Sequence, residues 1–219
     1  MGKMIKEYGE TMTEEYVAKH LPLYLFLQNF YGGQLNELNN AQWKELLTHI
    51  DKDTVSFEGS IVRQGVDIML SFSEEDAKEL KFDFNSLFIG PDRLKASPFE
   101  SSYRNETGAI LQTSTLAVRK FYEAAGLVVE LKNQEPDDHI IFELEFVCYL
   151  LEKSVDDEQS AFLYKEFHRR HLSQWIGKHC EKIRENSSNK LLVGISYILQ
   201  GLMEDEKKRN AKKEGIINE

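Results

Sequence analysis

The segment EPDDHIIFELEFVCYLL, residues 135–151, decides the expected fold. Residues 140–151 are apolar on nearly every side of a helix, a pattern typical of a central helix that other helices surround. Pro136 with carboxylates behind it matches a helix start, because proline suits the first helical position and acids favour the positive end of the helix dipole. The segment therefore predicts a buried helix from Pro136 to Lys153.

Helical periodicity continues on both sides of this segment. Apolar residues recur at helical spacing in seven further stretches, 16–31, 43–50, 61–72, 73–88, 114–125, 156–185 and 190–208. Pro22 lies inside the first stretch, where it either kinks one helix or begins a second. Val128 and Val129 are the only hint of a strand. The sequence thus predicts an all-α fold, a single-domain helical bundle of roughly eight to ten helices.

Composition sets the expected domain boundaries. Residues 1–13 predict a flexible N-terminal segment, residues 14–203 the helical domain, and residues 204–219 a charged, frayed C-terminal tail. Residues 90–113 hold two of the four prolines and follow no period. Long loops inside compact domains are usually functional or disordered, and the aromatic residues in this loop favour function.

Charge and cysteine content disfavour several classes of partner. The 219 residues include 27 basic and 37 acidic ones, and the net charge of -10 disfavours nucleic acid and anionic membranes as partners. Cys148 and Cys180 lie in apolar helical patterns without zinc-site spacing, as expected in a reducing compartment. The start of the chain lacks a signal-peptide pattern, and the apolar stretch 191–203 is too short to span a bilayer. We therefore expect a cytoplasmic protein without stable membrane insertion.

The second half of the chain contains a strongly acidic region. Residues 134–158 include nine acids and one base. Such a run is either a solvated face or a rim that binds basic peptides, and both interpretations stay open. Glu143 and Glu145 lie on different faces of the apolar helix, so they do not form an acid/base pair. Each is expected to bond a neighbouring helix end or an arginine, because an unpartnered buried carboxylate is costly.

Common catalytic signatures are absent from the sequence. It lacks phosphate-binding glycine loops, the GxSxG elbow and the Glu-x-x-His pairs of di-iron bundles. His168 and His171 share a helix face, where a structural role is favoured over metal ligation. We expect no catalytic residue, metal or cofactor. Two alternatives stay open: an adaptor that docks a partner on its acidic face, and a metal-dependent helical hydrolase using Asp137, Asp138 and His139.

Four motifs, taken in order, resemble a known family. They are Phe84-Asn85-Ser86-Leu87-Phe88-Ile89-Gly90-Pro91, Ser97-Pro98-Phe99-Glu100-Ser101-Ser102-Tyr103, Leu116-Ala117-Val118-Arg119 with Tyr122 and Gly126, and Glu135-Pro136-Asp137-Asp138-His139-Ile140 with Glu143-Leu144-Glu145-Phe146. Over about residues 80–151, the chain resembles the TorD/DmsD family of cytoplasmic redox-enzyme maturation chaperones.

This resemblance implies an all-helical chaperone that is not an enzyme. Its expected partner is the twin-arginine leader, and the apo form, of a molybdenum- or tungsten-containing oxidoreductase subunit. The chaperone would prevent premature export of that subunit and assist cofactor insertion. The expected assembly is a monomer or a domain-swapped dimer. The client and any binding of guanine nucleotide stay undecided.

The resemblance also implies a leader site, where the Gly-Pro to Ser-Pro loop meets the start of the Pro-Asp-Asp-His helix. Its expected residues are Phe88, Gly90, Pro91, Pro98, Phe99, Glu100, Tyr103, Pro136, Asp138 and His139. A leader pairs two arginines with an apolar helical stretch, so its receptor needs carboxylates beside an aromatic groove. We expect the charge from Asp137, Asp138 and Glu100, and the apolar contact from Phe88, Phe99 and Tyr103. Glu143 and Glu145 are expected as structural or rim carboxylates.

Overall fold

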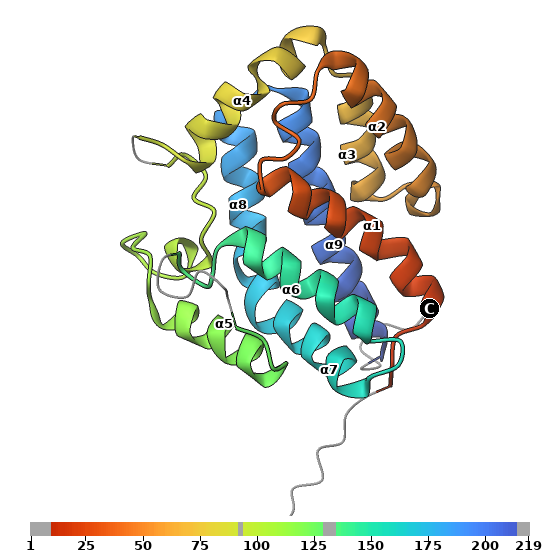
Figure 1. The fold of residues 1–219 in the computed structure, drawn as a ribbon, viewed down its shortest axis with the longest axis vertical. Helices are drawn as coiled ribbons and strands as arrows, with labels where there is room; N and C mark the ends of the chain where they lie inside the picture. Colours follow the sequence, from red (N-terminus) through yellow and green to blue (C-terminus); the bar gives the residue numbers. More distant parts are fainter. Residues whose placement is uncertain (1–9, 92–93, 129–134, 214–219) are drawn as a thin grey trace, which may run out of the picture.

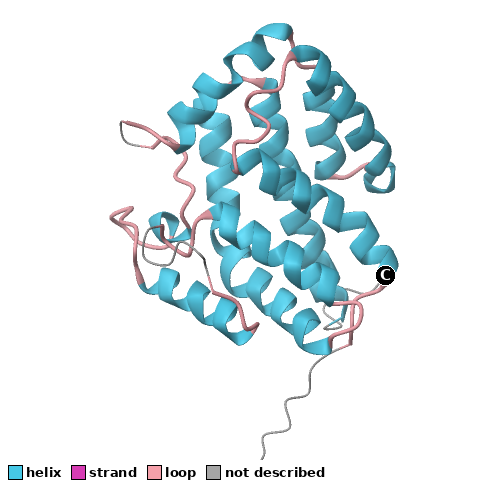
Figure 2. Cartoon of the chain, in the orientation of Figure 1, coloured by secondary structure: helices cyan, strands magenta, loops and turns pink. Residues whose placement is uncertain are grey.

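Helices make up nearly all of the regular structure of this chain. Figure 1 shows the computed structural model, which describes residues 10–91, 94–128 and 135–213. The α-helices in these ranges are α1 (Glu14–Tyr31), α2 (Asn40–Asp53), α3 (Ile61–Leu70), α4 (Glu74–Phe88), α5 (Thr113–Ala124), α6 (Ile140–Lys153), α7 (Glu158–Phe167), α8 (Ser173–Asn186) and α9 (Lys190–Lys213). Two 3-10 turns, Val55–Phe57 and Glu100–Tyr103, and a π-helical turn, His168–Leu172, complete the described helical structure. Figure 2 shows no strand in these ranges, so the predicted all-α fold is confirmed.

Helices α6 and α9 organise the core. The long helix α9 packs against α3 and α8, while α6 packs against α1 and α7. Fully buried aromatic residues fill the space between the helices: Trp43, Trp175, Tyr24, Tyr164, Phe30 and Phe167. Eight residues of α6 are buried, as expected for the central helix that its all-round apolar sequence predicts. None of the helices in the described residues is long and apolar enough to cross a membrane.

Side-chain caps fix where most of the helices begin. The Ser73 side chain accepts a hydrogen bond from the backbone N–H of Asp76, whose carboxylate accepts one from the Ser73 N–H in return. Thr13, Asn39 and Asp157 cap α1, α2 and α7 in similar ways. Helices α5 and α8 differ, because no side chain caps their starts, and α8 continues directly from the π-helical turn.

Helix α1 is continuous, with Pro22 in its interior, which decides between the two arrangements that the sequence left open. Two expected helix boundaries are wrong. The predicted helix over 156–185 is divided by the π-helical turn into α7 and α8. Helix α6 begins at Ile140, four residues after the predicted start at Pro136. The hint of a strand at Val128 and Val129 falls partly outside the described residues, and Val128 lies outside the helices.

Parts of both expected flexible ends are packed into the fold. Met12 is buried, and its backbone N–H donates to the carbonyl of Ser154 at 2.8 Å. Helix α9 continues through Lys213, and Glu206 is buried within the segment predicted as a frayed tail. Residues 1–9 and 214–219 lie outside the described residues. The packed part of the chain therefore extends further toward both ends than the polar composition of residues 1–13 and 204–219 indicates.

Glycines allow α3 and α9 to pack at close range. A β-carbon placed on Gly194 of α9 would lie 2.6 Å from the carbonyl oxygen of Gly65. A β-carbon on Gly65 would lie 2.7 Å from the carbonyl oxygen of Gly194. Both separations are shorter than van der Waals contact, so any side chain at either position would push the helices apart.

We expect Gly194→Ala to lower the free energy of unfolding by about 1–3 kcal/mol, because the added methyl overpacks this contact. Gly177→Ala is the matched control, since nothing lies within 4 Å of a β-carbon at that position in α8. It should raise the free energy of unfolding by about 0.5–1 kcal/mol through better helix propensity. Urea unfolding measures both values, and a stabilised Gly194 variant would contradict the close contact.

Candidate functional site

The Ser-Pro loop and the start of α6 are joined through their backbones. The N–H of Ile140 donates to the carbonyl of Pro98 at 2.8 Å, and the N–H of Glu100 donates to the carbonyl of Asp138 at 3.0 Å. An isolated antiparallel bridge pairs Phe99 with His139. The two segments that the leader site was expected to combine therefore do meet, and we call this contact the junction (residues 98–101 and 138–140).

Asp138 fastens the junction with its side chain as well. Its carboxylate Oδ2 accepts a hydrogen bond from the backbone N–H of Ser101 at 2.7 Å. The residue is fully buried, and its Oδ1 has no partner in the described residues. The Asp138 side chain therefore holds the Ser-Pro loop in place from the protein interior and does not face solvent.

His139 caps α6 and contributes a neutral ring. Its Nδ1 accepts a hydrogen bond from the N–H of Ile141 at 3.2 Å, which places the ring proton on Nε2. Burial lowers the pKa of His139 to about 4, so the imidazole is uncharged at neutral pH. The ring meets Phe99 edge-on at 4.9 Å between centroids and Phe142 at 6.0 Å. These three partly exposed rings form what we call the aromatic edge.

Asp137 is held by helix α5. Arg119 donates to its Oδ2 through Nε at 2.8 Å and approaches it through Nη2 at 2.6 Å. The hydroxyl of Tyr122 donates to its backbone carbonyl at 2.9 Å. Asp137 is only 2% exposed, and Arg119 of the same chain already neutralises its charge.

Glu100 is likewise buried and paired. Its Oε2 lies 2.7 Å from His171 Nδ1, and its Oε1 accepts from Arg104 Nη1 at 2.7 Å. Glu100, Asp137 and Asp138 thus lie beneath the surface, and the expectation that they form an exposed charged rim is wrong. A buried carboxylate needs such partners, and here the chain supplies them.

Glu143 and Glu145 have different environments. Glu143 is fully buried, and Trp175 Nε1 donates to its Oε2 at 3.1 Å. Burial raises the pKa of Glu143 well above its usual range, and the nearby charges of Glu100 and Asp138 raise it further. Glu145 is exposed. The expected bonds to a helix end or an arginine are wrong for both residues in the described part of the chain.

His179 connects the remaining predicted residues to the junction. Its Nδ1 lies 3.0 Å from the carbonyl of Ser97, which also accepts from the hydroxyl of Tyr103 at 2.8 Å. The Phe88 ring packs 5.7 Å from that of His179, but Phe88 is 5% exposed and belongs to the core. Burial lowers the pKa of His179 to about 3, which makes it a neutral structural residue.

The other predicted loop residues lie at different depths. Gly90 has a φ of 98°, which favours glycine, and Pro91 beside it is exposed. Pro98 is buried, whereas Pro136 is partly exposed. Within the described ranges, no group of three or more His, Cys, Asp or Glu residues is placed to hold a metal ion.

The partners of the buried acids are what sequence reasoning missed. They are Arg104, Arg119, His171 and Trp175. Arg119 and Tyr122 stood in a family motif without an assigned role, and Arg104 follows Glu100 by four residues. Such spacing is a usable signal for an ion pair.

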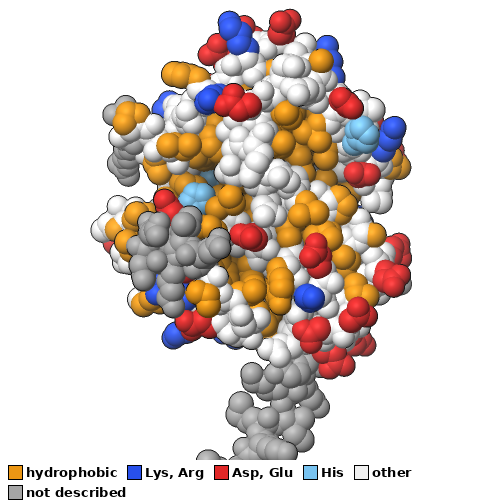
Figure 3. Space-filling model, in the orientation of Figure 1, with side chains coloured by type: hydrophobic (Ala, Val, Ile, Leu, Met, Phe, Trp, Pro, Cys, Tyr) orange, Lys and Arg blue, Asp and Glu red, His pale blue; other side chains and the backbone are white. Residues whose placement is uncertain are grey.

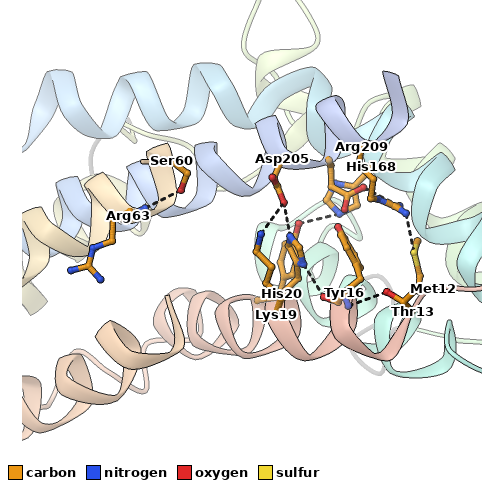
Figure 4. A network of polar contacts seen from close by, with 12 residues as sticks. Met12, Thr13, Tyr16, Lys19, His20, Ser60, Arg63, His168, Asp205 and Arg209 are labelled. Carbon is orange, nitrogen blue, oxygen red and sulfur yellow. Dashed lines mark hydrogen bonds and ion pairs between the residues drawn. The ribbon is translucent and has the colours of Figure 1, made fainter. Parts of the chain in front are cut away.

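A second polar cluster ties α1 to α9 away from the junction (Figure 4). His20 Nε2 lies 2.7 Å from Asp205 Oδ2, and the guanidinium of Arg209 lies 4.6 Å over the ring of Tyr16. A cavity of about 400 Å³ beside them is lined by both acidic and basic residues, Lys19 and Asp205 among them. With charges of both signs and a 4.0 Å Lys19–Asp205 ion pair, the cluster serves to hold the two helices together.

We expect Asp138→Ala to lower the free energy of unfolding by about 1–3 kcal/mol, because it leaves the buried Ser101 N–H without an acceptor. Asp138→Asn retains a side-chain oxygen and should lose less. Glu145→Ala, at an exposed position, should change stability by less than about 0.5 kcal/mol. Urea unfolding followed by circular dichroism gives these values. An unchanged Asp138→Ala protein would show that the junction does not depend on this side chain.

Comparison with known proteins identifies the family. A family model described as nitrate reductase delta subunit matches residues 33–181. The chaperone protein TorD of Vibrio parahaemolyticus is 24% identical over 198 residues, which cover 83% of this chain and 89% of the relative. The probable Tat proofreading chaperone DmsD of Haemophilus influenzae is 31% identical over 106 residues, 48% of this chain and 49% of the relative. The chain therefore belongs to the nitrate reductase delta subunit family and, as its four motifs indicate, to the TorD/DmsD redox-enzyme maturation chaperones.

Proposed function

We propose that this chain is a cytoplasmic chaperone for a molybdenum- or tungsten-containing oxidoreductase subunit. It binds the twin-arginine leader and the apo form of that subunit, prevents premature export and assists cofactor insertion. Its role is binding rather than catalysis. The observation that carries the proposal is the junction, which brings two family motifs together beside partly exposed aromatic rings.

The aromatic edge supplies the apolar part of the proposed site. Phe99, His139 and Phe142 lie side by side, and the neutral His139 ring adds no charge that would repel an arginine. Figure 3 shows further hydrophobic side chains gathered on the face that carries α1 and α6. An apolar leader helix would bind such a surface in the helix-in-groove mode.

Exposed acids beside the aromatic edge supply the charge. Glu135 directly precedes Pro136, and Glu145 lies three residues after Phe142, on a neighbouring part of α6. Both are exposed, and neither forms an ion pair with another described residue. They replace Glu100, Asp137 and Asp138 as the first carboxylates that an approaching arginine meets, because those three are buried.

Calorimetric titration with synthetic twin-arginine leaders, from oxidoreductases encoded near this chain, tests the proposal. We expect saturable one-site binding that weakens at least tenfold, about 1.4 kcal/mol, when both arginines become lysines, since lysine lacks the bidentate fork. Binding that vanishes with salt and ignores apolar changes in the leader would favour the docking adaptor instead. The absence of both binding heat and a shift in melting temperature with every leader tested would contradict the proposal.

The double variant Glu135→Gln with Glu145→Gln tests the charged part of the site. We expect leader affinity to fall about two- to tenfold at low salt, as for two exposed ion pairs, and the difference to shrink at high salt. Glu181→Gln is the control, because Glu181 is an exposed acid on α8. If Glu181→Gln lowers leader affinity by as much as the double variant does, the loss comes from net charge, and Glu135 and Glu145 are not part of the site.

A further inference from the structure

Helix α5 covers an apolar surface next to the junction. The Phe121 ring meets those of Phe167 at 5.5 Å and His171 at 5.1 Å, and the Tyr122 ring meets that of Phe146 at 4.8 Å. Phe146 and Phe167 are buried in the presence of α5. Figure 1 shows α5 on the outside of the bundle, so the helix is the outer layer over this surface.

The chemistry of α5 matches that of the proposed ligand. It carries two adjacent basic residues, Arg119 and Lys120, and it turns Val118 and Tyr122 inward. A leader likewise combines adjacent basic residues with an apolar helical stretch. Arg119 already occupies Asp137, one of the carboxylates that the family motif assigns to the leader.

Several features leave the start of α5 poorly satisfied. It has no side-chain cap at its start, and the buried hydroxyls of Ser114 and Thr115 lack partners in the described residues. Leu111, before the helix, has a φ of 59°, which is strained for a residue with a side chain. The other end of the helix is closed by Gly126, whose φ of 75° allows the N–H of Leu127 to donate to the carbonyl of Tyr122 at 2.8 Å, so opening would begin at the uncapped start. Such a segment is a candidate for local opening at modest cost.

We propose that leader binding displaces α5, and that the apolar stretch of the leader then binds the surface of α6 and α7 that α5 covers in the free protein. We call this covered surface the leader groove. One leader arginine takes the place of Arg119 on Asp137. Such an exchange keeps the buried carboxylate paired throughout, whereas an unpaired buried charge would be strongly destabilising. This inference rests on the proposed function and adds where the apolar part of the leader binds and what regulates access to it.

Hydrogen exchange of the full chain, with and without a saturating synthetic twin-arginine leader, tests the exchange directly. The amides of residues 137–142 should become more protected as the leader binds. The amides of α5, residues 113–124, should exchange at least about tenfold faster, because the displaced helix loses its packing. Circular dichroism controls for global unfolding.

A variant that removes a single polar tie between α5 and α7 provides the second measurement. Gln159 Nε2 donates to the carbonyl of Ala124 at 3.1 Å and ties the end of α5 to α7. Gln159→Ala should raise leader affinity about two- to tenfold, since one hydrogen bond no longer opposes displacement. Asn186→Ala is the matched control, because it removes a similar amide bond, to the carbonyl of Lys182 within α8, and should leave affinity unchanged.

The outcomes separate this inference from the proposed function. Protection of the amides of residues 137–142 with unchanged or slower exchange in α5 would overturn the displacement of α5 and leave leader binding intact. Unchanged affinity in Gln159→Ala would likewise count against displacement. No protection anywhere at saturating leader concentration would overturn both the inference and the proposed function.

Discussion

The burial of negative charge at the junction is the constraint on which the site depends. Four acids from three chain segments lie beneath the surface, Glu100, Asp137, Asp138 and Glu143. Each needs a donor or a proton, because an unmatched carboxylate in a low-dielectric interior is costly. Arginines, a histidine, a tryptophan and backbone N–H groups meet that need, and they come from α5, α8, the π-helical turn and the Ser-Pro loop. Matching these charges thus fixes several elements against one another at once.

The fold was largely predictable from the sequence because hydrophobic periodicity is a local property. The all-round apolar pattern of residues 140–151 predicted a central helix, and α6 is one. Its start was predicted too early because Pro136 and two aspartates imitate a helix start. The aspartates instead bond Arg119 and Ser101, and His139 caps the helix. Those partners lie far away in sequence, where no local pattern reveals them.

The candidate site was predictable at the level of segments and less so at the level of side chains. The motifs indicated that the Ser-Pro loop and the Pro-Asp-Asp-His segment would meet, and the backbone bonds between them confirm this. The motifs could not show which carboxylates face solvent, because exposure depends on arginines supplied by other elements. The exposure of Glu145 was equally hard to predict, since this residue lies within an apolar helix and is nevertheless exposed.

The π-helical turn between α7 and α8 sets the rotational phase of everything after it. Such a turn holds one residue more than an α-helical turn, which shifts the following side chains around the helix axis. His171 lies within the turn, and Trp175 and His179 follow it at intervals of four residues; the three side chains reach Glu100, Glu143 and Ser97 in turn. Removing a single residue from 168–170 would restore a regular helix and rotate all three contacts away together. The extra residue of the π-helical turn is therefore what aligns these three side chains with the site, and inserting one residue into a regular helix is enough to create such a turn.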